Sequence, residues 1–187
     1  MTLDGLTKGA AGLDVAYRDA LQRIKDQLVS WRPKLAEKVI SWITFAKRPL
    51  TTSELCCALA VEPGEAKLDE EREYDVEDLI SVCAGLVVVD QESDVIRLVH
   101  YTARKCFERT RDVWNPDGEL QIATTCLTYL CFLAFQSGSC PTDKDLEERL
   151  KENHFLGYAA KHWGKHARPV EAKVANLASK LLQSRLL

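Results

Sequence analysis

The sequence predicts a mainly α fold: a winged helix-turn-helix with a small β-hairpin wing, followed by an α-helical extension. Three observations lead to this prediction. Apolar residues recur with helical spacing in the successive segments before residue 85. Two β-branched segments then flank four polar residues, which is typical of a hairpin. After Asn115-Pro116-Asp117-Gly118, a strong boundary signal, the apolar patterns are helical again.

Residues 1–33 are expected to form a flexible start and a linker helix. Residues 13–29 have the apolar spacing of a helix. This helix is expected to end at Trp31-Arg32-Pro33, because proline disfavours helical geometry in the residue before it. The next helix is predicted over 34–46.

The clearest helix start lies at Thr51. Its hydroxyl is placed to accept the backbone N–H of Glu54, three residues later. The Glu54 carboxylate is placed to accept the backbone N–H of Thr51, and the two bonds together make a capping box. Leu50 and Leu55 occupy the flanking positions of a hydrophobic staple. The helix that begins here is expected to run to about Ala60.

A winged-helix domain is predicted over 34–112 from the order of its elements. Gly85 follows the third helix and is expected to end it, as glycine commonly does. The polar residues 91–94 then form the hairpin turn. In chain order the expected elements are helices over 34–46, 51–60 and 76–84, strands over 86–90 and 95–100, and a helix over 101–111.

Residues 113–187 are expected to form the helical extension. Thr142 and Asp145 make a second, weaker cap pair. The last helix ends on Leu186-Leu187, which is expected of a chain cut from something larger. Three sets of residues share helix faces: Ala123, Cys126, Leu127, Leu130 and Ala134; Phe155, Ala159, Trp163 and Ala167; and Val174, Leu177, Ala178, Leu181 and Leu182.

The composition is that of a globular protein without an unusual charge. A net charge of −3 gives no bulk attraction to nucleic acid or to anionic membranes. No apolar run approaches the roughly 20 residues of a membrane span, and the first residues lack the apolar core of a secretory signal. None of the seven cysteines forms a C-x-x-C pair, so reduced, packed thiols are expected. We therefore expect a cytoplasmic protein with no membrane partner.

The sequence holds none of the motifs that mark common catalytic sites. It has no G-x-x-x-x-G-K-[ST] phosphate loop and no G-x-S-x-G nucleophile elbow. His162 and His166 are four residues apart, a spacing that suits a metal ion, but no third ligand accompanies them. We predict no enzymatic activity, no metal and no cofactor bound by this chain itself, and we expect the two histidines to be packed or solvated.

Four segments, in this order, resemble a known family: Trp42–Leu55 (WITFAKRPLTTSEL), Ser81–Val87 (SVCAGLV), Arg97–Thr102 (RLVHYT) and Tyr158–Gly164 (YAAKHWG). They are similar to the winged-helix region of fungal NACHT–ankyrin proteins, which is also catalogued as the GPI inositol-deacylase winged-helix domain. In that family the region follows a nucleotide-binding NACHT module and precedes ankyrin repeats. This chain shows neither of those two parts, so the resemblance implies the middle piece of a signalling ATPase.

The resemblance also implies a site. In related signalling ATPases a histidine at the junction of hairpin and helix contacts bound ADP, and here that residue is His100. Arg97, Tyr101 and Thr102 surround it in sequence and complete the expected nucleotide-sensing group. Plant disease-resistance relatives have aspartate after this histidine, where this chain has Tyr101. The alternative is that His100 lies at a strand end and makes its hydrogen bonds within its own domain.

Large aromatic residues are expected at the core or at a domain interface. Trp42, His162 and Trp163 are the candidates for packing against the neighbouring domain.

The function predicted is a non-catalytic regulatory and protein-interaction module that restrains or relays the nucleotide state of a NACHT-type NTPase. The NTPase and the ankyrin repeats would be partners, either on the same polypeptide or on another one. The domain would contact ADP or ATP only when the nucleotide is bound to the NTPase. A standalone adaptor or a non-functional gene fragment is the alternative. DNA binding is disfavoured because residues 76–83 hold two acids and no lysine or arginine, although affinity for DNA requires neutralised phosphates. A hydrolase is disfavoured because no nucleophile with a positioned base is found.

Overall fold

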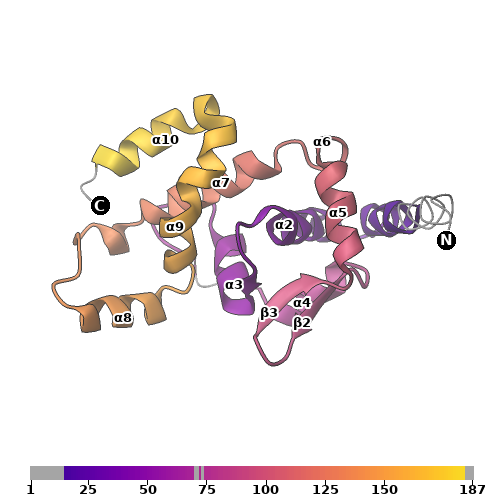
Figure 1. Cartoon of the computed structure of the whole chain (residues 1–187), viewed down its shortest axis with the longest axis horizontal. Coiled ribbons are helices and arrows are strands. Elements are labelled where there is room, and N and C mark those ends of the chain that lie inside the picture. Colours follow the sequence, from indigo (N-terminus) through magenta and orange to yellow (C-terminus); the bar gives the residue numbers. More distant parts are fainter. Residues whose placement is uncertain (1–14, 70–71, 73, 184–187) are drawn as a thin grey trace, which may run out of the picture. The chain divides into compact units, whose positions relative to one another are not determined.

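The computed structural model describes residues 15–69, 72 and 74–183 (Figure 1). Helices dominate it, with one small hairpin. After helical residues 15–25, the elements are α2 (Trp31–Phe45), β1 (Leu50–Thr51), α3 (Thr52–Ala60), α4 (Val76–Val82), β2 (Val87–Asp90), β3 (Val95–Leu98), α5 (Tyr101–Arg109), α6 (Arg111–Trp114), α7 (Gly118–Leu130), η2 (Leu133–Phe135), α8 (Asp143–Glu152), α9 (Leu156–Ala167), η3 (Arg168–Val170) and α10 (Glu171–Gln183). The expected order of three helices, hairpin and helical extension is confirmed.

The chain divides into two compact units. The first takes its described residues from 1–49 and 75–116, and the second from 50–74 and 117–187. The units therefore alternate along the sequence, whereas the predicted domains follow one another. The predicted domain boundaries at 33 and 112 stay a prediction.

The first unit is built around α2. Val39 and Ile40 of this helix are fully buried, as are Leu79 of α4 and Phe107 of α5. An aromatic cluster joins the end of α2 to α5 and α6: the rings of Phe45 and Trp114 stack with centroids 5.8 Å apart, and the Phe107 ring lies 5.4 Å from that of Trp114. This core leaves the α5 N-terminus at the surface.

The hairpin is regular and antiparallel. Val87 pairs with Leu98 and Asp90 with Val95. Gly85 has a φ of 82°, in the left-handed region where glycine alone is unstrained, so it turns the chain from α4 into β2 as predicted. Along β3 the side chains alternate between buried Ile96 and Leu98 and exposed Arg97, as a half-buried strand requires.

The second unit is built around α7 and α9. Most of its largest buried side chains come from these helices and their ends, α3 adds the fully buried Leu55, and α10 adds Val174 and Leu181. Tyr129, Phe135 and Phe155 meet with ring centroids 5.2–5.3 Å from Tyr129. A backbone bond from the Leu133 N–H to the Ala66 carbonyl, 2.9 Å long, holds the loop after α3 to η2.

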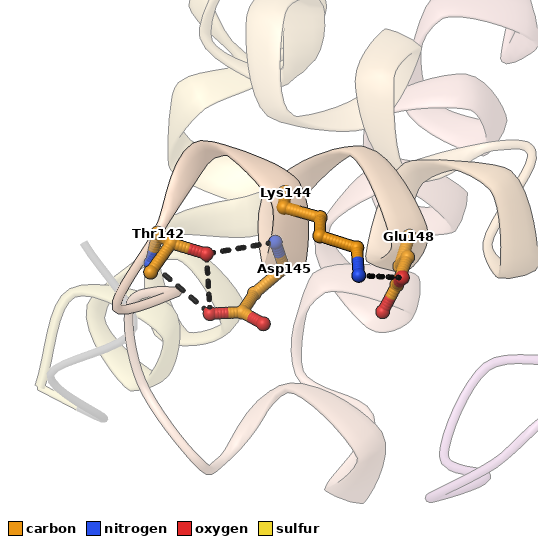
Figure 2. A network of polar contacts seen from close by, with 4 residues as sticks. All are labelled: Thr142, Lys144, Asp145 and Glu148. Atoms are coloured by element: carbon orange, nitrogen blue, oxygen red, sulfur yellow. Dashed lines mark hydrogen bonds and ion pairs between the residues drawn. The ribbon is translucent and has the colours of Figure 1, made fainter.

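Both predicted capping boxes are present. The Thr51 hydroxyl accepts the Glu54 N–H at 3.2 Å, and the Glu54 carboxylate accepts the Thr51 N–H at 3.0 Å. Thr142 and Asp145 do the same at the start of α8, and Figure 2 shows this box beside the Lys144–Glu148 ion pair.

Several predicted details are wrong for identifiable reasons. α2 begins at Trp31, so Pro33 lies inside its first turn, where the missing N–H has no helical partner to lose. Leu28 is fully exposed because helical structure stops at residue 25, and residues 13 and 14 lie outside the described part. Ala134 and Leu182 are exposed as well, since α7 ends at Leu130 and α10 buries only Val174 and Leu181.

Candidate functional site

His100 lies where β3 gives way to α5, and it is the N-cap of that helix. Its backbone is extended, with φ −135° and ψ 140°, as an N-cap requires. Its Nδ1 accepts the Thr102 N–H at 3.3 Å, which satisfies one of the helix-start donors that lack a helical partner. The imidazole therefore caps the start of α5, a role that serine or aspartate has in most helices.

A chain of hydrogen bonds fixes the His100 ring from one side. The Thr102 Oγ1 lies 2.8 Å from Nδ1, and the Tyr17 Oη lies 2.5 Å from that same Oγ1. A backbone N–H only donates, so Nδ1 is an acceptor and carries no proton. The Thr102 hydroxyl therefore donates to the ring, the Tyr17 hydroxyl donates to Thr102, and the neutral ring keeps its proton on Nε2.

The other side of the junction faces solvent. Val99 and Tyr101 are 49% and 68% exposed, and His100 between them is exposed too. The flanking Leu98 and Ala103 are buried at 6% and 2% exposure, so the backbone on either side is anchored. Among the described residues no hydrogen bond involves Nε2, which leaves an N–H donor at the centre of a partly apolar surface.

Lys105 adds a cation to this surface. Its Nζ lies 5.3 Å from the centroid of the Tyr101 ring, within the range of a cation–π contact. The Tyr101 ring is in turn 5.0 Å from the imidazole of His100. The junction therefore presents an imidazole, a phenol ring and an ammonium group side by side, a set that suits an anionic or polar partner.

Arg97 turns toward the hairpin. Its guanidinium lies 3.7 Å from the Asp90 carboxylate. Hydrogen bonds from the Ser93 hydroxyl and backbone lower the pKa of Asp90, with a smaller contribution from Arg97. Of the four predicted residues, the structure joins His100, Tyr101 and Thr102 and directs Arg97 to a separate ion pair.

Residues 21–113 match the family model described as the winged-helix domain of GPI inositol-deacylase. The chain contains a winged-helix domain of this family. The matched segment includes the hairpin and the His100 junction, while α7 to α10 lie outside it.

A curated relative matches a longer stretch of the chain. The azaphilone pigments biosynthesis cluster protein L of Monascus ruber is 28% identical over 166 residues, which cover 78% of this chain. These residues make up 34% of that protein, so the chain spans about a third of the relative's length. No solved structure matches the chain.

Tyr17 and Lys105 were missed as site residues. Tyr17 occupies an apolar position of the predicted linker helix and lies 85 residues from Thr102, so only the folded winged-helix domain brings them together. Lys105 is four residues after Tyr101, and this helical neighbour spacing is the signal that could have found it.

The three predicted interface residues differ in exposure. Trp42 is buried at 4% exposure within the first unit, as expected of a core tryptophan. Trp163 is half-buried on α9. His162 is half-buried as well, with its ring 4.9 Å from that of Tyr158.

His166, by contrast, lies in the core of the second unit. Its side chain is fully buried, its Nδ1 is 2.7 Å from the Glu119 carboxylate and its Nε2 is 2.8 Å from the Tyr158 hydroxyl. Both ring nitrogens are therefore used within the protein. Within 15–69, 72 and 74–183 no three His, Cys, Asp or Glu side chains gather closely enough to hold a metal ion.

The cysteines are thiols. None of the seven forms a disulfide, and all seven lie within the described ranges. Burial raises the pKa of Cys83 to about 12 and also raises that of Cys126, which keeps these sulfurs protonated and unreactive. In the part of the chain that the structure describes, we find no helix of sufficient length and apolar character to cross a membrane.

Proposed function

We propose that the winged-helix domain is a non-catalytic regulatory module that contacts a NACHT-type NTPase through the His100 junction. The proposal rests on one observation: hydrogen bonds hold the His100 imidazole along its Nδ1 edge only, among the described residues. Tyr17 and Thr102 hold one edge of the ring, while the exposed His100 makes no described hydrogen bond through Nε2 and is flanked in sequence by the exposed Val99 and Tyr101. Exposed apolar groups beside a fixed polar donor are typical of a protein interface.

The junction suits a partner that presents a phosphate. An imidazole N–H donates to a phosphate oxygen, and a hydrogen bond to a charged acceptor is stronger than a neutral one. The module would favour the ADP state by making this contact only there. Couplings of this kind amount to about 1–3 kcal/mol, which one or two hydrogen bonds can supply.

A nucleic-acid partner fits the surface less well. In a winged helix the third helix enters the major groove. Here α4 carries Glu77 and Asp78 in its first turn and no basic residue. Both acids are exposed and would repel phosphates, so we propose a protein partner.

The absence of catalysis is also part of the proposal. Glu119, His166 and Tyr158 form the one carboxylate–imidazole–phenol arrangement noted in the described chain, but His166 and Tyr158 are fully buried. A substrate could not reach either ring without opening the core. This group is better explained as structural.

The length of the relative supports a module within a larger system. The Monascus ruber protein extends well beyond the matched segment, which makes up 34% of it. The NTPase and the ankyrin repeats would then be met in cis or in trans. A standalone adaptor is the alternative, and the experiment below separates the two.

The test is calorimetric binding of this chain to a separately purified NACHT module of a fungal NACHT–ankyrin protein, loaded with ADP or with an unhydrolysable ATP analogue. Three variants accompany it. His100→Ala removes cap and donor, His100→Asn keeps a cap acceptor and removes the ring, and His154→Ala is a control at another exposed histidine.

We expect tighter binding to the ADP form, with the preference lost in both His100 variants and kept in His154→Ala. Equal binding to both forms would contradict the regulatory role, because a ligand without preference shifts no equilibrium. Binding to neither form would favour the adaptor.

A further inference from the structure

Two cavities in the second unit share part of their lining on α9, and together they are called the groove here. The larger has a volume of about 880 Å³ and is lined by residues of α7 to α10 and of the loop 137–142. Small-molecule sites typically measure about 300–1,000 Å³. The smaller cavity, about 490 Å³, shares Ala160, Lys161 and Trp163 with the larger one.

The helix α8 lines the larger cavity with two leucines, Leu146 and Leu150, beside Asp143 and Arg149. None of its ten residues is buried, yet its two leucines both line the larger cavity. Leu146 and Leu150 are 45% and 39% exposed, on a helix that is otherwise charged. Helices of this kind normally cover a core with such residues, whereas here both leucines are exposed among the described residues.

This helix is fixed although it lacks a buried face. The capping box of Thr142 and Asp145 closes the start of α8 (Figure 2). The Arg149 guanidinium donates to the Gly138 carbonyl at 2.7 Å and to the Ser137 hydroxyl at 3.0 Å. These bonds tie the helix to the loop that precedes it, so the larger cavity is preformed, and a ligand need not order its walls.

The smaller cavity is cationic. Lys161, Lys165 and Arg168 line it, and its other lining residues are uncharged. In the described ranges no carboxylate lies within ion-pairing distance of any of the three side chains. Trp163 lines both cavities, and its side chain combines an apolar ring with one N–H donor.

We propose that this groove binds a small amphipathic anion: an apolar chain in the larger cavity and a carboxylate or phosphate head at Lys161, Lys165 and Arg168. The two α8 leucines line the larger cavity and the three cations line the smaller one, and the cavities share Ala160, Lys161 and Trp163. A ligand with both properties satisfies both cavities, whereas a neutral or cationic one leaves the charges without a counterion. The site is separate from the His100 junction, so its failure would leave the proposed function standing.

The first test is calorimetric titration of the full chain with four single-chain probes below their micelle concentrations: dodecanoate, dodecyl phosphate, dodecanol and dodecyltrimethylammonium. We expect both anions to bind, dodecanol to bind more weakly and the cation to bind weakest. Lys161→Glu/Lys165→Glu should weaken dodecanoate binding about tenfold, because each exposed charge contributes a few-fold. Lys151→Glu on α8, which makes the same charge change outside both cavities, should leave it unchanged.

A second readout locates the ligand. Cys140 is half-buried and lines the larger cavity, whereas Cys57 is half-buried elsewhere in the same unit. Dodecanoate should slow alkylation of Cys140 by iodoacetamide, followed by mass spectrometry, and should not slow that of Cys57. Ala160→Trp, which fills the point shared by the cavities, should abolish this protection while leaving the circular dichroism spectrum unchanged.

The proposal is overturned if dodecanoate and dodecanol bind equally, or if Cys140 stays unprotected at saturating dodecanoate. Vesicles of phosphatidylcholine with phosphatidic acid distinguish the source of the anion. Co-flotation of the chain with these vesicles, without binding of free dodecanoate, would mean a membrane surface and would also overturn the small-ligand site.

Discussion

His100 and His166 show two opposite uses of one side chain. His100 is exposed at a helix start and uses only Nδ1, as an acceptor for the Thr102 N–H and hydroxyl. His166 is fully buried near the end of α9 and uses both nitrogens, with Glu119 and Tyr158. The Nε2 of His100 has no hydrogen bond among the described residues, whereas both ring nitrogens of His166 bond within the fold.

The two rings also differ in tautomer. Because Nδ1 of His100 accepts, the neutral ring carries its proton on Nε2. A carboxylate accepts from Nδ1 of His166, so the neutral ring carries its proton there and accepts the Tyr158 hydroxyl on Nε2. The comparison teaches that the partners of a histidine, rather than its presence in a motif, decide whether it is available for binding.

The largest effect is expected from His166→Ala. Removal of a fully buried ring leaves a cavity and deprives the Glu119 carboxylate and the Tyr158 hydroxyl of a partner. We expect the free energy of unfolding to fall by about 3 kcal/mol or more. Urea denaturation followed by circular dichroism measures this, with His154→Ala as the surface control. A loss equal to that of the control would show that the network is not structural.

A smaller effect is expected from His100→Ala. The loss of an N-cap side chain should lower the free energy of unfolding by about 1 kcal/mol. His100→Asn should restore most of it, since asparagine is among the best N-caps. The same urea titrations compare the two variants. If His100→Asn were as unstable as His100→Ala, the ring would contribute more to the fold than its capping bond.

Tyr17→Phe sharpens the comparison further. It removes one partly buried hydrogen bond to Thr102 and should cost about 0.5–1 kcal/mol. The ¹⁵N chemical shifts of the His100 ring should move, because Thr102 loses the donor behind it, while those of His166 should not. Unchanged His100 shifts would contradict the proposed chain of bonds.

The smallest effect concerns pH and the hairpin. The pKa of Asp90 is lowered, chiefly by the Ser93 hydrogen bonds, so its ionised form stabilises the folded state. This contribution is present above the pKa of Asp90 in the unfolded chain and is lost as the pH falls through its lower folded value. In Asp90→Asn the acid-side slope of stability against pH should be slightly shallower, measured by thermal melts. An identical slope would argue against the Ser93 bonds in solution.

Local features were readable from the sequence because their partners are close along the chain. Thr51 and Glu54 are three residues apart, and the hairpin turn spans four residues. The place of His100 at the hairpin–helix junction was predicted for the same reason. Pro33 misled the prediction of the α2 start, since a proline in the first turn is tolerated.

The side chains that set the chemistry of each histidine were not readable. Tyr17 reaches Thr102 across 85 residues, and Glu119 reaches His166 across 47. Such pairs depend on how the helices pack, and the spacing of residues along the sequence does not predict that packing. The groove beside α8 was missed for a related reason: Leu146 and Leu150 have the spacing of a core face, and only the folded unit leaves that face uncovered.

The most direct test of the account is an NMR titration of the chain, with ¹⁵N-labelled histidine, by the ADP-loaded NACHT module. Ring nitrogen shifts identify the tautomer and report contact at each imidazole. We predict that the free chain shows His100 protonated on Nε2 and His166 on Nδ1, and that the module shifts the His100 signals and leaves those of His166 in place. Binding of the module without any shift at His100 would contradict the account.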